Sequence, residues 1–214
     1  MLLSRTEFDK KLSKGDLRIA LIGMSNIGKS HTARRIAEAY GFDHYDVDAH
    51  IQAKMGNPSM QAMAKWMGQP YDQGYRERAA TYLEMETEIT LNAQGQRGNQ
   101  VLDTTGSVIH GGANVIKIIK NNYLIIYIQA NSDDIDVLTN RYLEYPKPTI
   151  WAQNYRPVSG LDPQQAALSR YPDMLASRAL LYEEMADISL PAEMLSAPDL
   201  NDSAILGAFR ANLP

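Results

Sequence analysis

The chain is 214 residues long, which suits one α/β domain with an inserted lid better than two independent domains. Its formal net charge of −4 gives no broad electrostatic case for binding nucleic acid or an anionic membrane surface. The absence of cysteine excludes disulfides, thiolate zinc sites and cysteine nucleophiles.

Residues 1–15 predict a short polar helix that ends at Gly15, and we interpret them as an N-terminal extension of the domain. The N-terminus already carries a charge at Arg5, too early for a signal peptide. No apolar run approaches the about 20 residues that a membrane helix needs. We therefore expect a soluble, cytoplasmic protein without a membrane or nucleic-acid partner.

A strand, a loop and a helix follow in the order typical of a phosphate-binding loop. The apolar run Leu17–Ile22 has the pattern of a buried parallel strand. Gly23–Gly28 predicts a loop and Lys29–Tyr40 a helix, with Gly41 as its C-terminal cap. Within this unit, Gly23-x-x-x-x-Gly28-Lys29-Ser30 matches the Walker A pattern in full.

The loop contains the residue types that nucleotide phosphates require. Its glycines let successive backbone N–H groups point at phosphate oxygens, and the helix adds the positive end of its dipole. We expect Lys29 to reach the β- and γ-phosphates and the Ser30 hydroxyl to coordinate Mg²⁺, so ATP and Mg²⁺ are the predicted cofactors. The predicted nucleotide-binding residues of the loop are Met24, Ser25, Asn26, Ile27, Gly28, Lys29, Ser30 and His31.

The rest of the chain alternates predicted strands and helices. This alternation indicates a P-loop NTPase three-layer α/β sandwich, with a central parallel sheet of about five strands and helices on both faces. Further strands are predicted at Phe42–Val47, Gln100–Thr104, Tyr123–Ile128 and, at an edge, Asp187–Leu190. Helices are predicted at about Ser59–Met67, Asp72–Asn92, Ala113–Lys120, Ser132–Tyr145, Pro163–Met185 and Asp202–Ala211. Pro172 leaves open whether the helix Pro163–Met185 is continuous.

Acidic residues end two of the predicted strands. Asp46-Val47-Asp48 ends the second, where the carboxyl ends of parallel strands meet at the ligand crevice. Alternation along a strand would point both carboxylates the same way, one facing the metal through water and the other an acceptor hydroxyl. Asp103 follows Val101-Leu102 in the Walker B geometry for magnesium, with an ordinary strand-end cap as an equal alternative.

Three further segments complete a recognisable pattern. They are Gly74-Tyr75-Arg76 in the long helix, Val101-Leu102-Asp103-Thr104-Thr105-Gly106-Ser107 at the third strand, and Arg178-Ala-Leu-Leu-Tyr-Glu-Glu-Met-Ala-Asp187. With Asp46-x-Asp48 and the phosphate loop, they resemble the shikimate kinase family over about Arg18–Leu190. After the phosphate loop, the segment that begins at Arg178 is the most specific match.

This resemblance implies a role for each matching residue. Asp48 resembles the acid that contacts the acceptor hydroxyls and accepts the proton, and Asp46 resembles a water-mediated magnesium contact. Arg76 and Arg178 resemble two arginines that clamp the substrate carboxylate through charge-assisted hydrogen bonds. Gly106 resembles the backbone donor at the substrate.

Departures from the family pattern bear on the substrate. The Gly-Gly-Gly turn of the family is here Thr105-Gly106-Ser107, whose two added side chains narrow the site or supply hydroxyl donors. The family glutamate expected three residues after Arg76 falls on Ala79. Glu77, Glu84 or another residue would then have to orient the arginine.

A long irregular segment at about 146–163 is the predicted lid of a single P-loop kinase domain, 1–214. The family has an Arg-Pro pair here, whose arginine meets the transferring phosphate. Lys147-Pro148 and Arg156-Pro157 both match this place in part, so Lys147 and Arg156 are both candidate catalytic residues. Arg141, on the helix before the lid, is placed like the family arginine that stacks on adenine.

These features predict a shikimate kinase-like phosphotransferase. It would move the γ-phosphate of ATP to a hydroxyl of a small carboxylated metabolite, and shikimate is the first candidate acceptor. The alternatives are another hydroxy acid or polyol as acceptor, and an ATP-binding regulatory protein that has lost catalysis. We expect a monomer or a small homo-oligomer.

Overall fold

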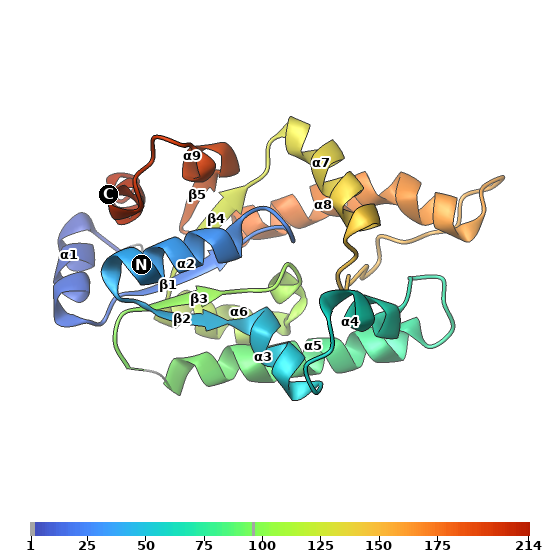
Figure 1. Cartoon of the computed structure of the whole chain (residues 1–214), viewed down its shortest axis with the longest axis horizontal. Coiled ribbons are helices and arrows are strands. Elements are labelled where there is room, and N and C mark those ends of the chain that lie inside the picture. The colour runs from blue at the N-terminus through green and yellow to red at the C-terminus, as the bar shows by residue number, and fades with distance from the viewer. Residues whose placement is uncertain (1–2, 96) are drawn as a thin grey trace.

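Five parallel strands form the centre of this computed structural model, which describes residues 3–95 and 97–214. The sheet has the order β2-β3-β1-β4-β5 (Figure 1). Its strands are β1 (Arg18–Ile22), β2 (Asp43–Asp46), β3 (Gln100–Asp103), β4 (Leu124–Gln129) and β5 (Ile188–Pro191). The predicted fold class is therefore confirmed, and each predicted strand is present with ends shifted by a few residues at most.

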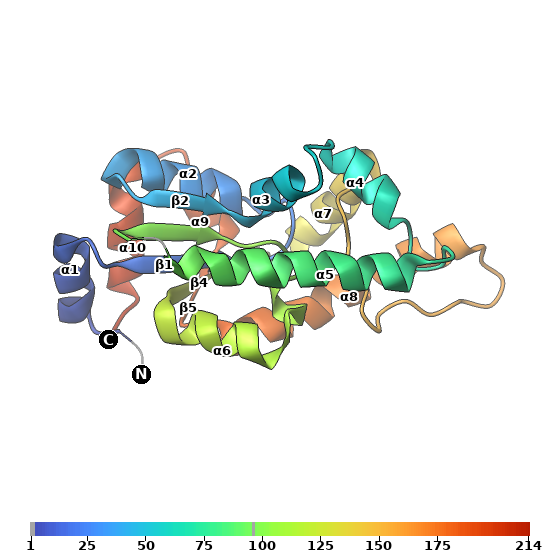
Figure 2. The same cartoon turned by 90° about the horizontal axis from the view of Figure 1, so that it is seen from below.

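Helices cover both faces of the sheet because the central strands β1 and β4 are buried on both sides. In β1, Ile19 and Leu21 belong to one buried cluster, whereas Ala20 and Ile22 belong to the other. This is the two-residue alternation of a strand with both faces buried. The first face packs against α1 (Arg5–Lys14), α2 (Lys29–Tyr40), α9 (Ala192–Ser196) and α10 (Ile205–Ala211). The second packs against α5 (Tyr75–Asn92), α6 (Gly112–Asn122) and α8 (Pro163–Met185) (Figure 2).

Three helices lie beyond the carboxyl ends of the strands: α3 (Val47–Lys54), α4 (Met60–Met67) and α7 (Ser132–Glu144) (Figure 1). The remaining helical turns are η1 (Ala93–Gly95), η2 (Val108–His110) and η3 (Asp202–Ala204). No helix among the residues that the structure describes is long and apolar enough to cross a lipid bilayer.

The structure corrects one expectation about an individual element and answers a question that the sequence left open. The second strand ends at Asp46 and not at Val47, because the Asp46 carboxylate accepts the backbone N–H of Ala49 at 3.0 Å and so caps α3, a helix that we had not predicted. Asp48 therefore lies in the first turn of a helix, and strand alternation does not set its direction. Pro172 does not interrupt α8, which runs unbroken from a capping box at Asp162.

Segment 145–162 contains no helix or strand, yet its middle is firmly packed. Ile150 and Trp151 are only 3% and 1% exposed. The Tyr75 hydroxyl of α5 donates to the Thr149 carbonyl at 2.9 Å and accepts the Trp151 N–H at 2.8 Å. The segment is thus attached to the helix that forms one wall of the site described below.

Candidate active site

The phosphate loop connects β1 to α2 in a conformation that requires glycine at its first position. Gly23 has φ 144°, and a Cβ atom there would lie 2.7 Å from the Ile128 carbonyl oxygen of β4. Such a contact is shorter than real Cβ atoms show, so the backbone turns here only without a side chain. Asn26 also has a positive φ, 67°, a conformation that asparagine tolerates better than most residues.

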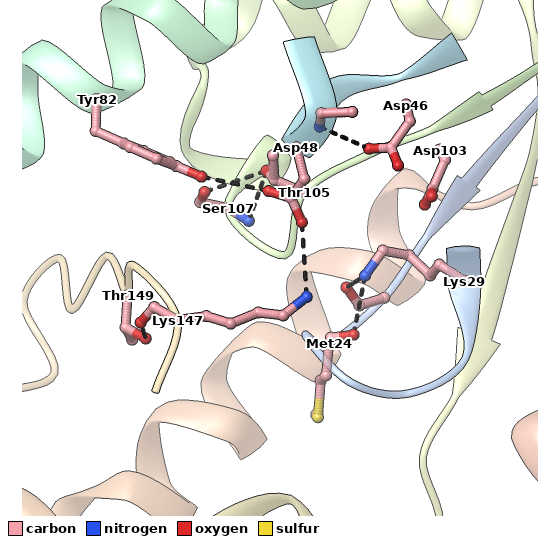
Figure 3. A network of polar contacts seen from close by, with 12 residues as sticks. Met24, Lys29, Asp46, Asp48, Tyr82, Asp103, Thr105, Ser107, Lys147 and Thr149 are labelled. Atoms are coloured by element: carbon pink, nitrogen blue, oxygen red, sulfur yellow. Dashed lines mark hydrogen bonds and ion pairs between the residues drawn. The ribbon is translucent and has the colours of Figure 1, made fainter. Parts of the chain in front are cut away.

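Lys29, at the start of α2, is buried inside the curve of the loop. Its Nζ donates to the carbonyl oxygens of Gly23 at 3.0 Å and Met24 at 2.9 Å (Figure 3). Burial lowers the pKa of Lys29, and the negative charges of Asp103 and Asp48 offset part of that effect. The Lys29 ammonium group is therefore bound to two backbone carbonyls, and a phosphate that binds it would have to displace them.

A cavity of about 450 Å³ opens beside the loop. Its walls are Ser25, Asn26, Gly28, Lys29, Ser30, His31, Asp48, Thr104, Arg141, Glu144, Tyr145 and Lys147. The volume lies in the range of small-molecule sites. A larger depression of about 760 Å³ lies between α2 and residues 196–202, but His31 is the single predicted nucleotide-binding residue in it. The smaller cavity is therefore the candidate nucleotide site.

Most of the predicted nucleotide-binding side chains meet in this cavity. Arg141 of α7 lines it, and its guanidinium donates to the Asn26 carbonyl at 2.8 Å, which ties α7 to the phosphate loop. Met24 and Ile27 do not line it: Met24 is 1% exposed within the core, and Ile27 packs against the core from outside.

Asp48 and Lys147 mark the junction between this cavity and a second, much smaller one. Lys147 Nζ lies 3.8 Å from Asp48 Oδ2, and the Tyr82 hydroxyl donates to Asp48 Oδ1 at 3.4 Å (Figure 3). Burial raises the pKa of Asp48, although its side chain stays 27% exposed, and the positive charges of Lys147 and Lys29 act in the opposite direction. Ser25, Asp48 and Lys147 line both cavities.

The second cavity is about 10 Å³ and is enclosed by α5, α8, the turn after β3 and segment 145–162. Its walls are Ser25, Asp48, Tyr82, Thr105, Gly106, Ser107, Lys147, Pro148, Ile150 and Arg178. Gly106 closes it against the phosphate loop, since a Cβ atom there would lie 2.7 Å from Ser25 Oγ. That Cβ atom would also lie 3.0 Å from the Ser25 backbone nitrogen, so Ser25 would have to shift to make room for it.

Glu86 is a buried acid behind this second cavity that the sequence did not reveal. It is 2% exposed and accepts a hydrogen bond from the Ser107 hydroxyl. Burial raises its pKa to about 7, and the hydrogen bond from Ser107 opposes that rise. Thr105 and Ser107, the side chains that replace two glycines of the family turn, therefore form a polar network with an acid.

Arg178 of α8 is 4% exposed and is held by backbone oxygens. One terminal nitrogen donates to the Gly106 carbonyl at 3.1 Å, which also accepts the Tyr182 hydroxyl at 2.6 Å, and the other donates to the Ile150 carbonyl. Arg178 Nε is buried without a hydrogen-bond partner. Arg178 thus lines the second cavity and is joined to segment 145–162.

Two predicted cations are not brought to the site. Arg76 is exposed on α5 and lines neither cavity, so the structure does not place it opposite Arg178. Arg156 is also exposed and lines neither cavity, whereas Lys147 lines both. Of the two lid candidates, Lys147 is therefore the one beside Asp48.

The position of Arg76 follows from the register of α5. Tyr75 and Ala79 face the core, but the residues at the second cavity are Tyr82 and Glu86, seven positions further along. Seven residues change the direction of a helical side chain by only about 20°. On the same face of α5, two turns later, Tyr82-x-x-x-Glu86 has an acid where Tyr75-x-x-x-Ala79 has alanine, and this spacing was the signal for Glu86. Leu83 follows Tyr82 directly, as Arg76 follows Tyr75, so leucine stands where the arginine would be in the later turn.

The predicted metal aspartates lie together at the carboxyl ends of neighbouring strands. Asp46 of β2 pairs with Asp103 of β3, and both lie near Lys29 (Figure 3). Neither lines the 450 Å³ cavity, whereas Ser30 does. His44 joins them, with its Nε2 3.5 Å from Asp103 Oδ2.

Known proteins resemble this chain in sequence and in fold. The family model for shikimate kinase matches residues 25–202. The shikimate kinase of Histophilus somni is 29% identical over 185 residues, which cover 84% of this chain and 87% of that protein. The shikimate kinase of Bordetella avium is 26% identical over 173 residues, covering 81% and 70%.

Solved structures agree at the level of the fold. Shikimate kinase from Acinetobacter baumannii in complex with shikimate has a TM-score of 0.61 and 18% identity, covering 92% of this chain and 93% of that one. Shikimate kinase from Aquifex aeolicus has a TM-score of 0.60 and 18% identity, covering 92% and 98%.

Proposed function

Because the chain belongs to the shikimate kinase family, we propose that it transfers the γ-phosphoryl group of ATP to a hydroxyl of shikimate. Membership makes the chain an ATP-dependent small-molecule kinase; the acceptor and the residue roles are our proposal. One observation carries it: Ser25, Asp48 and Lys147 line both the 450 Å³ cavity beside the phosphate loop and the cavity next to Arg178. Donor and acceptor would meet at these three residues.

In this proposal the ATP phosphates lie against the phosphate loop and the base lies towards Arg141. Lys29 would exchange its two carbonyl partners for the β- and γ-phosphate oxygens, a stronger charge-assisted contact. The loop N–H groups and the start of α2 would bind further phosphate oxygens. Arg141, fixed by the Asn26 carbonyl, would form one side of the adenine site.

Mg²⁺ fits this site because the donors present are oxygens. The Ser30 hydroxyl lines the cavity next to Lys29 and would hold the ion together with phosphate oxygens. When bound, the ion supplies charge neutralisation on the phosphates. Asp46 and Asp103 lie outside the cavity lining, so we assign them contact through water at most.

For the transfer itself, we assign the acceptor hydroxyl to Asp48. The hydroxyl oxygen forms a bond to the γ-phosphorus, its proton passes to Asp48, and the bond to the bridging oxygen breaks to release ADP. Burial raises the pKa of Asp48, which makes the ionised carboxylate a stronger base than a solvated one. Lys147 and Lys29 would stabilise the charge on the transferring group from two sides.

Acceptor binding requires this second cavity to open. A volume of about 10 Å³ holds roughly one water molecule, far less than a substituted six-membered ring. Lys147, Pro148 and Ile150 form one wall, and we propose that segment 146–163 of a single kinase domain is the lid that moves. Because Tyr75 and Arg178 hold residues 149–151, the motion would centre on residues 145–148 or would break those bonds.

A different hydroxy acid or a polyol is the second candidate acceptor, and the arginine count favours it. Arg178 is the single arginine among the described residues that line the second cavity, because Arg76 is exposed. A substrate carboxylate would therefore meet one arginine in this cavity and not the pair that the family pattern implies. Glu86 and Ser107 offer hydroxyl-binding groups instead.

A coupled ADP-release assay across shikimate, quinate and gluconate tests the proposal. We expect saturable turnover of shikimate, with the lowest KM of the three, that depends on ATP. Robust turnover of gluconate with none of shikimate would replace shikimate by the second candidate. ADP release that is the same with and without each acceptor would contradict both.

A further inference from the structure

His44, Asp46 and Asp103 converge at one corner of the sheet, outside the lining of both cavities. One ligand atom from each side chain lies within 4.8 Å of the other two. The strand geometry explains this meeting: Asp46 is paired with Asp103 across β2 and β3, and His44 is two residues earlier on β2 and so on the same face.

Two atoms of this cluster lack the partners that buried polar groups normally have. Asp103 is 2% exposed, and its Oδ2 accepts no hydrogen bond. His44 Nε2 is buried and has no hydrogen-bond partner either, although it lies 3.5 Å from that same oxygen. A buried carboxylate oxygen without a hydrogen bond is costly, and a group of this kind in a native structure calls for an explanation.

Lys29 supplies a charge opposite to that of Asp103 but no hydrogen bond. Lys29 Nζ is directed to the carbonyls of Gly23 and Met24 and makes no hydrogen bond to Asp103. Asp46 uses Oδ1 to cap α3, which leaves its other oxygen available. The cluster thus offers one imidazole nitrogen and two carboxylates around a common point.

We propose that His44, Asp46 and Asp103 bind a first-row transition-metal dication, such as Mn²⁺ or Zn²⁺, without any nucleotide. Mg²⁺ prefers an all-oxygen octahedron, whereas an imidazole nitrogen favours transition metals. Ligands about 2.1 Å from one ion lie at most about 4.2 Å apart, so small side-chain rotations complete the site. Three protein ligands leave further positions open to water.

Manganese EPR on the metal-stripped full chain, with neither ATP nor acceptor present, tests the site. We expect one bound Mn²⁺ per chain, a histidine nitrogen coupling in the pulsed spectrum, and little competition from an equal concentration of Mg²⁺. Absence of Mn²⁺ binding, or bound Mn²⁺ without nitrogen coupling, would overturn the proposal and leave His44 and Asp103 as a simple ion pair. Because no kinase substrate is involved, this result is independent of the proposed function.

Variants assign the ligand set. His44→Ala should weaken Mn²⁺ binding at least about tenfold, since ligand loss removes one of three protein contacts. Its control is Glu38→Ala, which removes an exposed carboxylate of α2 outside the cluster and outside both cavities and should retain wild-type Mn²⁺ affinity. Circular dichroism of each stripped variant checks the fold. Equal Mn²⁺ affinity in a folded His44→Ala protein would also contradict the proposal.

Discussion

Replacing Lys147 by methionine removes the cation between the two cavities while keeping much of the side-chain volume. Its Nζ lies 3.8 Å from Asp48 Oδ2, and the two side chains are 30% and 27% exposed. At that separation two unit charges interact by about 4 kcal/mol at an effective dielectric constant of 20 and about 1 kcal/mol in water. Loss of one such contact to a transition state costs about 2.7–4 kcal/mol, so kcat should fall about 10²–10³-fold.

The pH dependence of Lys147→Met adds a second readout. Asp48 must be ionised to take the proton, and the charge of Lys147 lowers a pKa that burial raises. Without Lys147 the pKa of Asp48 rises, so the acidic limb of the kcat/KM profile should move to higher pH. An exposed lysine with a purely structural role would leave that limb unchanged.

Steady-state ADP release with the best acceptor measures both effects, with Arg156→Met as the comparison. Arg156 is exposed and lines neither cavity, so its loss should change kcat by less than about threefold. If Arg156→Met lost activity and Lys147→Met kept it, the lid would close differently and the assignment of Lys147 would be refuted.

Three further predictions concern the loop and the buried acid. Lys29→Ala should lower kcat by at least about 10²-fold, and a wild-type rate in the ADP-release assay would contradict its role. Glu86→Gln should gain stability relative to wild type as pH rises from about 4.5 to about 7. The pKa of Glu86 is raised to about 7 in the folded protein, so as pH rises the carboxyl group ionises in the unfolded chain before it ionises in the folded one. The wild-type protein therefore loses stability between about pH 4.5 and pH 7, and Glu86→Gln does not. In urea unfolding, the free energy of unfolding of Glu86→Gln minus that of wild type should be larger at pH 8 than at pH 5 by up to about 3 kcal/mol. A difference that does not depend on pH would argue against a buried neutral acid. Gly106→Ala would place a Cβ 2.7 Å from Ser25 Oγ, so we expect the KM for ATP to rise at least about tenfold, and an unchanged KM would show that the loop relaxes freely.

The fold could be predicted from the sequence because its signals are local. Tyr123–Ile128 lacks charged residues, and Leu17–Ile22 is apolar except at Arg18; burial on both faces of a parallel strand imposes that pattern directly. The Walker A spacing likewise encodes its own backbone turn, and Lys29, Ser30 and Arg141 line the predicted nucleotide cavity. The strands and the phosphate loop needed only residues close in the chain, whereas Arg141 was assigned through the family resemblance.

The residues of the acceptor site could not be predicted as fully, because they depend on the register in which helices and loops pack against one another. A seven-residue repeat keeps Tyr75 and Tyr82 on one face of α5, so sequence pattern alone does not say which turn meets the second cavity. Only packing against the turn after β3 brought Glu86 to the site and left Arg76 in solvent. The path of segment 145–162 likewise chose Lys147 over Arg156.

Local backbone and burial preferences were thus enough to predict the phosphate loop and the order of strands and helices, and the family resemblance added the class of chemistry. Only the tertiary structure showed which cations line the second cavity and that His44, Asp46 and Asp103 lie together. His44 shows the difference most clearly. Nothing in its neighbours along the chain marks it, and it meets Asp103 only because two strands pair in one register.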